Sequence, residues 1–133
     1  MENTSMQVFN FDAGHYCSIK GDTQAEKVQL YNMLNSGGDR LGDHINETID
    51  VRDLFISFVE VTDKMSGEII ELPRIVLIDR DGKQYVAISK GIYRAVSNIV
   101  QIFGRPTWEP ALRVKVRQKL SKNNNQFLSL DLE

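Results

Sequence analysis

Hydrophobic and polar positions alternate along two runs of β-forming residues, Leu72–Asp79 and Lys83–Ser89. The runs flank Asp81-Gly82, a dipeptide typical of two-residue hairpin turns because both positions require a positive φ. A two-residue turn fixes the strand register, and cross-strand partners point to the same face. The predicted partners, counted from the turn, are Arg80 with Lys83, Ile78 with Tyr85, Val76 with Ala87, and Arg74 with Ser89.

This register gives the hairpin two different faces. The aliphatic face is expected to be buried in the core, and it consists of Ile75, Leu77, Val86 and Ile88. The opposite face is expected to be exposed, and it mixes cations with apolar and aromatic side chains: Arg74, Val76, Ile78, Arg80, Lys83 and Tyr85. An exposed face of this composition requires an explanation.

A helix is expected directly after the hairpin. Ser89 is its predicted N-cap, and Gly104 followed by Pro106 ends it. Its apolar residues recur at helical spacing: Ile92, Val96, Ile99, Val100 and Phe103.

A second helix is expected nearer the N-terminus, over about Gln24–Asn35. Thr23 and Glu26 have the spacing of a capping box at its start, and Ser36-Gly37-Gly38 ends it. Its expected packing face consists of Val28, Leu30, Tyr31 and Leu34. Packing is favoured over docking of a partner, because an amphipathic helix of this length usually covers one end of a small domain.

Four further stretches predict strands. Ile49–Thr62 has apolar residues on both faces, so we expect it to bend or bulge. Ala111–Lys119 alternates between an aliphatic and a cationic face, Phe127–Leu132 alternates as well, and Gln7–Phe11 has the pattern of a short edge strand. The inward residues of the two long alternating strands are expected to be Leu112, Val114, Val116, Leu128, Leu130 and Leu132.

Two residues mark interruptions of these patterns. Pro73 lacks a backbone donor, so we expect it on an edge, at a bulge or beyond the paired region. Trp108 lies between Pro106 and Pro110, beside the end of a helix, and is expected to close the core rather than to form an exposed stacking platform.

Length and charge add a second kind of information. A chain of 133 residues suits one domain with a real core, and its net charge of −2 hides an uneven distribution. The first 50 residues are acidic, whereas between Arg105 and Phe127 only Glu109 opposes the basic residues. These are Arg105, Arg113, Lys115, Arg117, Lys119 and Lys122. The asymmetry suggests a polyanion-binding surface, and a merely solvated face is the alternative.

Cysteine usage and hydropathy indicate a cytoplasmic protein that does not contact a membrane. Cys17 is the single cysteine, which excludes an internal disulfide and fits a reducing compartment. No apolar run approaches the roughly 20 residues needed to span a bilayer, and the N-terminus lacks the layout of a signal peptide.

Neither a cofactor nor catalysis is expected. His15 and Cys17 are close in sequence, but a structural zinc needs four ligands and His44 is the only other histidine. The chain carries no nucleophile–histidine arrangement in plausible context, no glycine-rich phosphate loop and no HExxH motif. Asp79 and Asp81 are better explained as turn residues than as magnesium ligands.

The predicted elements from residue 48 onward follow the order strand, strand, strand, helix, strand, strand. This is the order of the OB-fold, a five-stranded, partly open Greek-key barrel. We therefore expect a mainly β fold, a β-barrel with helices, in which residues 48–133 form a five-stranded OB-fold with a helix between strands 3 and 4. Residues 1–47 are expected to form an N-terminal strand and helix extension packed on the barrel as one structural unit. An α+β domain with an open antiparallel sheet is the alternative.

The same region resembles a known family. The segments TIDVRDLFISFVEVTDKMSGEIIELPRIVLIDRDGKQYVAISKGIYRAV and IFGRPTWEPALRVKV are similar to the small single-stranded DNA-binding proteins of phages and mobile elements of Gram-positive bacteria. The likeness covers about Thr48 to the C-terminus and, more weakly, the helix Lys27 to Asn35; it is carried by Leu77-Ile78-Asp79 with Asp81-Gly82, and by Pro106-Thr107-Trp108. It implies an OB-fold that coats transient single strands during replication or recombination in the host cytoplasm, with replication or recombination proteins as further partners.

The chemistry of single-strand binding agrees with this resemblance. Binding without sequence preference requires cations for phosphates and flat side chains for bases, and each stacked base contributes about 1–3 kcal/mol. Cations recur at every second residue from Arg113 to Lys119, roughly 7 Å apart, close to the repeat of an extended nucleic-acid backbone. The loops Asp63–Gly67 and Ser121–Gln126 are expected to flank the groove. The residues expected to contact nucleic acid are Arg52, Lys64, Arg74, Arg80, Lys83, Tyr85, Arg113, Lys115, Arg117, Lys119 and Lys122.

Tyr85 is the favoured stacking residue, because the predicted register turns it away from the aliphatic face. Further stacking candidates are Phe55 or Phe58, Tyr93 and Phe127. The sequence does not separate DNA from RNA, since both carry phosphates and stacking bases, and it leaves the oligomeric state open. The alternative function is a non-catalytic phage accessory or structural protein that binds a protein partner through the acidic N-terminal region.

Overall fold

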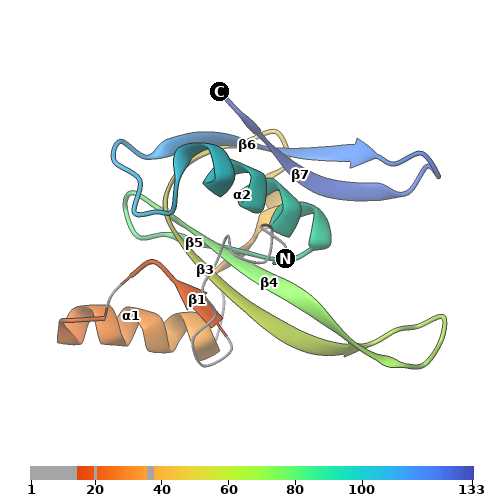
Figure 1. Ribbon diagram of the computed structural model, residues 1–133, viewed down its shortest axis with the longest axis horizontal. Helices are drawn as coiled ribbons and strands as arrows, with labels where there is room; N and C mark the ends of the chain where they lie inside the picture. Colours follow the sequence, from red (N-terminus) through yellow and green to blue (C-terminus); the bar gives the residue numbers. More distant parts are fainter. Residues whose placement is uncertain (1–14, 20, 36–37) are drawn as a thin grey trace, which may run out of the picture.

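The computed structural model describes residues 15–19, 21–35 and 38–133. The predicted edge strand Gln7–Phe11 lies outside the described residues. The described part forms a seven-stranded mixed sheet with two α-helices and a short 3-10 helix (Figure 1). In chain order the elements are β1 (His15–Cys17), α1 (Gln24–Asn35), β2 (Asp39–Arg40), η2 (Leu41–His44), β3 (Thr48–Thr62), β4 (Ile69–Asp79), β5 (Gln84–Ile88), α2 (Lys90–Phe103), β6 (Leu112–Leu120) and β7 (Gln126–Leu132).

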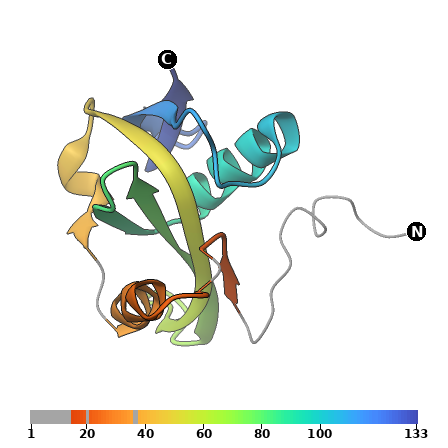
Figure 2. The same ribbon diagram turned by 90° about the vertical axis from the view of Figure 1, so that its left-hand side faces the viewer.

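The sheet curls around α2, so the fold is mainly β and has the form of a half-barrel (Figure 2). The strand order is β2-β5-β4-β3-β6-β7, and β1 pairs separately with β3. The long strand β3 serves three partners: β6 at its start, β1 near its middle and β4 along nearly all of its length. The expected irregularity is present as a register shift between Val51 and Asp53, where the strand bends from one partner toward the next.

The helix α2 packs on the concave side of the sheet, and both of its predicted ends are confirmed. The Ser89 side chain accepts a hydrogen bond from the Ile92 N–H at 3.1 Å, and the Gly104 N–H donates to the Val100 oxygen at 2.8 Å. Four of the five predicted apolar residues are buried in the main core, whereas Phe103 at the last turn is half exposed. Helix α2 therefore packs against β4 and β7 and shares one apolar core with residues of β3 and β6.

The helix α1 begins as predicted but turns a different face to the sheet. Thr23 Oγ1 accepts the Glu26 N–H at 3.1 Å and Glu26 Oε1 accepts the Thr23 N–H at 3.2 Å, which confirms the capping box. The expected packing face is wrong for Val28 and Tyr31, which are exposed. Met33, which is fully buried, carries the contact instead, with Leu30 partly buried beside it. The predicted end at Ser36-Gly37-Gly38 and the side chain of Leu34 fall at least partly outside the described residues.

The turn between β4 and β5 is one residue longer than the sequence pattern indicated. Asp79 pairs with Lys83 across a three-residue loop, since the Asp79 N–H donates to the Lys83 oxygen at 2.9 Å. Asp79 Oδ1 accepts the N–H groups of Asp81 and Lys83, both at 2.9 Å, and Gly82 has a φ of +88°. An aspartate that bonds the backbone two residues on, followed by a glycine in the left-handed region, stabilises the longer loop.

This extra loop residue overturns the predicted register. Tyr85 pairs with Leu77 instead of Ile78, and a one-residue slip moves every side chain of a strand to the other face. The inward residues of the hairpin are Ile75, Leu77, Tyr85 and Ala87. Val86 lies on the opposite side and Ile88 is half exposed, so their predicted places in the core are wrong.

The side of β4 and β5 that was expected to be open is covered by α1 and β1. Val76 and Ile78 are buried there with Phe55 and Met33 in a second, smaller apolar cluster. The hairpin is therefore buried on both faces, as its aliphatic residues on both sides allow. The predicted exposed binding face on this hairpin does not exist in the fold.

Three other expectations are confirmed. Pro73 pairs with Phe58 of β3 but lies at an edge on its other side, just beyond the pairs of β4 with β5, where its oxygen accepts the Ser89 N–H at 3.1 Å. Trp108 is buried, 6% exposed, and its Nε1–H donates to the Gly104 oxygen at 2.9 Å. The strand β6 buries Val114 and Val116. On β7, in contrast, Leu132 is half exposed instead of fully inward.

The order of β3, β4, β5, α2, β6 and β7 is the one expected for an OB-fold. The sheet does not close into a barrel, however, because β5 and β7 do not pair. Strand β7 pairs only with β6, and the edge of β5 pairs in parallel with β2. Among the described helices, none is long and apolar enough to cross a membrane.

Candidate nucleic-acid interface

A hollow of about 580 Å³ gathers arginines from three separate segments. Arg52 comes from the irregular part of β3, Arg80 from the β4–β5 turn and Arg113 from β6. Trp108 lines the same hollow. Its backbone N–H donates to the Arg52 oxygen at 2.9 Å and holds the residue there. The three guanidinium groups are exposed, so the fold brings together cations that the sequence separates by up to 61 positions.

Two acidic residues, Asp50 and Glu109, also line this hollow, and Asp50 partly neutralises its arginines. The Asp50 carboxylate lies 3.7 Å from Arg80 Nε and 3.4 Å from Arg113 Nε. The Oδ1 atom is buried and makes no hydrogen bond within the described residues. The arginines are thus oriented by long ion pairs, which leave their N–H groups open to another anion.

The predicted cationic row occupies the outer face of β6. Arg113, Lys115, Arg117 and Lys119 alternate with the buried valines of the strand, as expected. A carboxylate from the neighbouring strand β7 opposes them: Asp131 lies 3.6 Å from Arg117 Nη1 and 2.9 Å from Lys119 Nζ. The hydrogen bond from Lys119 holds the pKa of Asp131 below its ordinary value. Four cations thus face Asp50 and Asp131, and a third carboxylate, that of Glu133, lies at the end of the same strand pair, where it accepts a hydrogen bond from Thr48 at 3.0 Å.

Tyr85 does not belong to this surface. Only 9% of its area is exposed, and its ring packs edge-on against His44 with centroids 5.1 Å apart. Lys83 lies over the same ring and pairs with Asp39 at 3.2 Å, an ion pair that raises the pKa of Lys83. The prediction that Tyr85 is exposed and stacks on bases is wrong, and Lys83 belongs to a cluster with Asp39 and His44 beside the pair of β2 and β5.

Arg74 also has a structural partner. It is half buried, and its Nη1 donates to the Met33 oxygen near the end of α1 at 3.0 Å. Burial lowers the pKa of its guanidinium. A cation at the carboxyl end of a helix satisfies a carbonyl that has no partner within the helix. Its predicted place on an exposed face is therefore wrong.

Lys64 and Lys122 lie at the tips of two hairpins, β3–β4 and β6–β7. Figure 1 shows both hairpins leaving the body on the same side, one on either side of α2. Neither lysine makes an ion pair with a described residue. Lys122 continues the line of the β6 row, whereas Lys64 belongs to the other hairpin.

The other aromatic candidates lie in three different environments. Phe55 is fully buried, which rules it out as a stacking platform. Phe58 on β3 and Tyr93 on α2 contact each other edge-on, with centroids 6.0 Å apart. Phe127 on β7 remains 39% exposed and pairs across the strands with Lys119. Phe127 is thus the aromatic side chain next to the cationic row.

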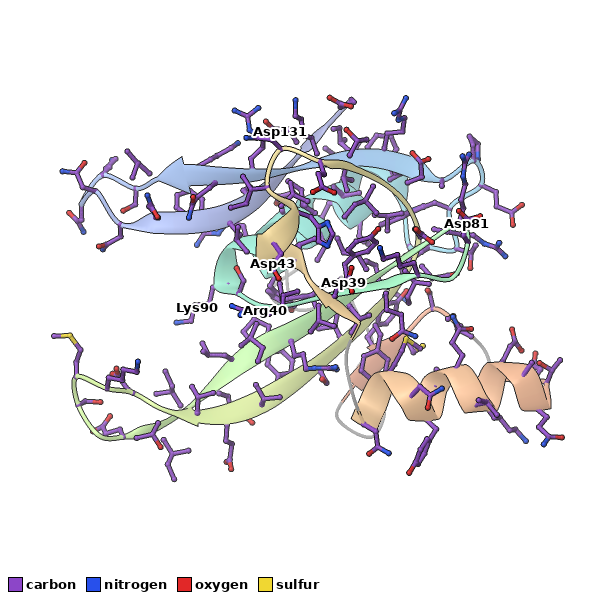
Figure 3. The ribbon with its side chains drawn as sticks, turned by 180° about the vertical axis from the view of Figure 1, so that it is seen from behind. Asp39, Arg40, Asp43, Asp81, Lys90 and Asp131 are labelled. Carbon is purple, nitrogen blue, oxygen red and sulfur yellow. The ribbon has the colours of Figure 1, made fainter. Side chains whose placement is uncertain are left out.

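Two cations on α2 were not singled out from the sequence. Lys90 and Arg94 are exposed, lie four residues apart on the polar face of α2, and have no acidic partner in the described part of the chain. Figure 3 shows Lys90 at the start of this helix, and Asp131 on the distant side of the β6–β7 hairpin. The signal available in the sequence was their spacing opposite the apolar stripe of a predicted helix.

The residues weighed for a metal site do not form one in this part of the chain. His15 and Cys17 lie on β1, but no three His, Cys, Asp or Glu side chains gather around a common point among the described residues. Burial raises the pKa of the Cys17 thiol to about 11, so it is protonated near neutral pH.

Comparison with known proteins agrees with the cationic geometry. Residues 12–133 match the family model described as phage single-stranded DNA-binding protein. The single-stranded DNA-binding proteins of Bacillus phages phi29 and PZA are each 28% identical to this chain over 132 residues, which cover 99% of it and 98% of each relative. No solved structure matches the chain. With its family model spanning nearly its whole length, the chain belongs to the family of phage single-stranded DNA-binding proteins.

Proposed function

We propose that this protein binds single-stranded DNA without sequence preference and coats it during phage or mobile-element replication or recombination. The observation that carries the proposal is the continuous band of cations on the outer face of β3 and β6, on a chain of this family. Arg113 belongs both to the arginine hollow and to the β6 row, so the band runs from Arg52 to Lys119.

The proposed strand follows this band rather than the outer face of β4 and β5. That outer face is covered by α1 and β1: Val76 and Ile78 are buried there, and Arg74 donates to the Met33 oxygen. We further propose that the fold is an open variant of the five-stranded OB-fold, with residues 1–47 as an N-terminal extension whose elements α1 and β1 cover this side. In such a variant the nucleic acid passes over the first, fourth and fifth strands, here β3, β6 and β7.

Electrostatics gives the binding its expected character. Phosphates would replace Asp50 and Asp131 as partners of arginines and lysines that are already oriented. Exposed ion pairs contribute at most about 1 kcal/mol each, so this exchange is readily reversible. Affinity then comes mainly from release of counterions and falls as salt rises, by a log–log slope of about 0.7 per neutralised phosphate of a single strand.

The experiment is a salt series of oligothymidine binding, followed by fluorescence anisotropy of the labelled oligonucleotide. Tryptophan quenching is less suitable, because Trp108 is buried and does not stack directly. We expect tight binding at low salt, and a double substitution, Arg113→Ala with Lys115→Ala, should lower the slope by about 0.7 for each lost phosphate contact.

Lys64→Ala is the control, because this lysine, although expected from the sequence to contact nucleic acid, is exposed on the β3–β4 hairpin and is not part of the band. It should leave the slope unchanged. Absence of oligothymidine binding at low salt would contradict the proposed function, and equal slopes for the double variant and the control would contradict the proposed path. Oligouridine in the same series separates DNA from RNA.

A further inference from the structure

We propose that the groove between α2 and β7 is a second contact for the same strand, in which one base stacks on Phe127 while Lys90 and Arg94 hold the adjoining phosphates. This inference rests on the proposed function and extends the contact surface from the outer face of β6 to the helix side of β7. Neither cation was expected from the sequence, and Phe127 was only one of several stacking candidates.

The groove has a volume of about 310 Å³ and is built by the close approach of β7 to the start of α2. Gly91 makes this approach possible, because a Cβ at this position would collide with the Leu128 oxygen and lie 3.2 Å from Phe127 Cδ2. The Phe127 ring is therefore held against the helix on one side while 39% of the residue stays exposed. A ring fixed in this way offers a flat surface without a further cost in side-chain freedom.

The charge of the groove differs from that of the β6 row. Lys90 and Arg94 project from consecutive turns of α2 on the groove side, and no described carboxylate pairs with either of them. In the β6 row, three of the four cations already have an acidic neighbour. Phosphate would thus meet unopposed cations in the groove, in addition to the N-terminal end of a helix.

Acidic residues on the β3–β4 hairpin, on the opposite flank of α2, also favour binding of DNA on the β7 side of this helix. Phe58 contacts Tyr93 of α2, so the face of β3 that carries Phe58 points toward this helix. Glu60 lies on the same face two residues on, and it pairs with Glu71 of β4. A polyanion on the solvent face of α2 is therefore repelled from the β3–β4 hairpin and directed toward β7.

Phe127 also joins the groove to the proposed band. It is the cross-strand partner of Lys119, the last cation of the β6 row, and β7 is an edge strand with no further strand beyond it among the described residues. A flexible single strand can therefore pass from Lys119 over the edge of β7 to Lys90. A rigid duplex cannot turn around one strand in this way.

The first test substitutes the ring and the two cations separately. Phe127→Leu keeps an apolar side chain against Gly91 but removes the stacking surface, so oligothymidine affinity should fall about 5- to 150-fold with an unchanged salt slope. Phe127→Trp should restore binding. Lys90→Gln with Arg94→Gln should lower the slope by about 0.7 for each lost phosphate contact.

Matched controls are available on α1, where Tyr31 and Lys27 are exposed and lie away from the groove. Tyr31→Leu and Lys27→Gln should bind as the wild type does. The groove proposal is overturned if the wild-type protein binds oligothymidine and the groove variants match these controls, a result that leaves the proposed function intact. Failure of the wild-type protein to bind would remove both proposals.

A second measurement needs no variant. Ultraviolet crosslinking of the wild-type protein to oligothymidine, followed by mass spectrometry of the peptides, should give a crosslink at Phe127. Crosslinks confined to peptides without Phe127 would overturn the groove proposal. An acidic peptide that competes with the DNA only when Lys90 and Arg94 are present, with no effect of Phe127→Leu on DNA binding, would assign the groove to a protein partner instead.

Discussion

Single carboxylates control how much of the cationic surface is open to an anion. Asp131 contacts Arg117 and Lys119, and Asp50 contacts Arg80 and Arg113. Each acid comes from a strand next to its cations and not from the same segment. The acids orient the basic side chains before binding and compete with phosphate during binding, so they limit affinity while they prepare the surface.

We predict that Asp131→Asn tightens oligothymidine binding at low salt, by up to about fivefold, because an exposed ion pair is worth at most about 1 kcal/mol. Asp43→Asn is the matched control: it makes the same change in net charge at an exposed residue that has no ion pair in the described part of the chain. Anisotropy titrations of both variants measure the difference. If they tighten binding equally, only net charge matters and Asp131 does not compete for Arg117 and Lys119.

At the scale of elements, the position of the β6–β7 hairpin depends on the contact between α2 and β7. Among the described glycines, Gly91 and Gly38 are those where an added Cβ would collide with backbone, and at Gly91 this backbone belongs to β7. Gly42 also approaches β7, but a Cβ there would lie 3.8 Å from Leu128 Cδ1, an ordinary contact. The backbone of β7 therefore lies close to Gly91, whereas Gly42 has room for a side chain beside β7.

We predict that Gly91→Ala destabilises the protein by about 1–3 kcal/mol, since the added methyl group forces β7 away from α2. Gly42→Ala, the control, should change stability by much less. Urea unfolding followed by circular dichroism measures both. Equal midpoints for the two variants would show that β7 does not pack on α2 as closely as described.

For the molecule as a whole, the half-barrel is closed on one side, among the described strands, only by the short strand β2, which pairs with β5. Strand β2 and the 3-10 helix after it hold the edge of β5, and His44 fastens them there. Its Nδ1 lies 2.9 Å from Glu47 and its Nε2 lies 3.2 Å from Asp39, which also pairs with Lys83. The hydrogen bond with Glu47 raises the pKa of His44, against a smaller opposing effect of burial.

We predict that the stabilisation of the fold by the His44 contacts weakens as pH rises. Because the folded-state pKa of His44 is raised, its contribution is complete below the ordinary histidine pKa of about 6.5 and is lost as pH rises through the higher folded value. The urea midpoint of the wild-type protein should exceed that of His44→Gln by more at about pH 5.5 than at about pH 8.5. An equal gap at both pH values would show that protonated His44 does not stabilise the fold.

Much of the fold was predictable, and much less of the site. The capping box, both ends of α2, the long bent strand and the buried Trp108 follow from short patterns, because caps and spacing act over a few residues. The cationic alternation of β6 was predictable for the same reason. The burial of Tyr85 was not predictable, because it depends on one extra loop residue after Asp79. The partner of Arg74 was not predictable either, because it lies on a helix that is distant in the sequence.

The sequence by itself determined the longer helices and strands, their order from residue 48 onward, and the gathering of basic residues in the last third of the chain. The short elements β1, β2 and η2 were not predicted, because two to four residues are too few to show a periodic pattern. Only the tertiary structure decided which faces remain open. The hairpin β4–β5 has apolar residues on both sides, so local pattern cannot say which side α1 covers. Pairing of each cation with Asp50 or Asp131, and the meeting of Phe127 with Lys90 and Arg94, require strands and a helix to come together across the fold, which no local spacing encodes.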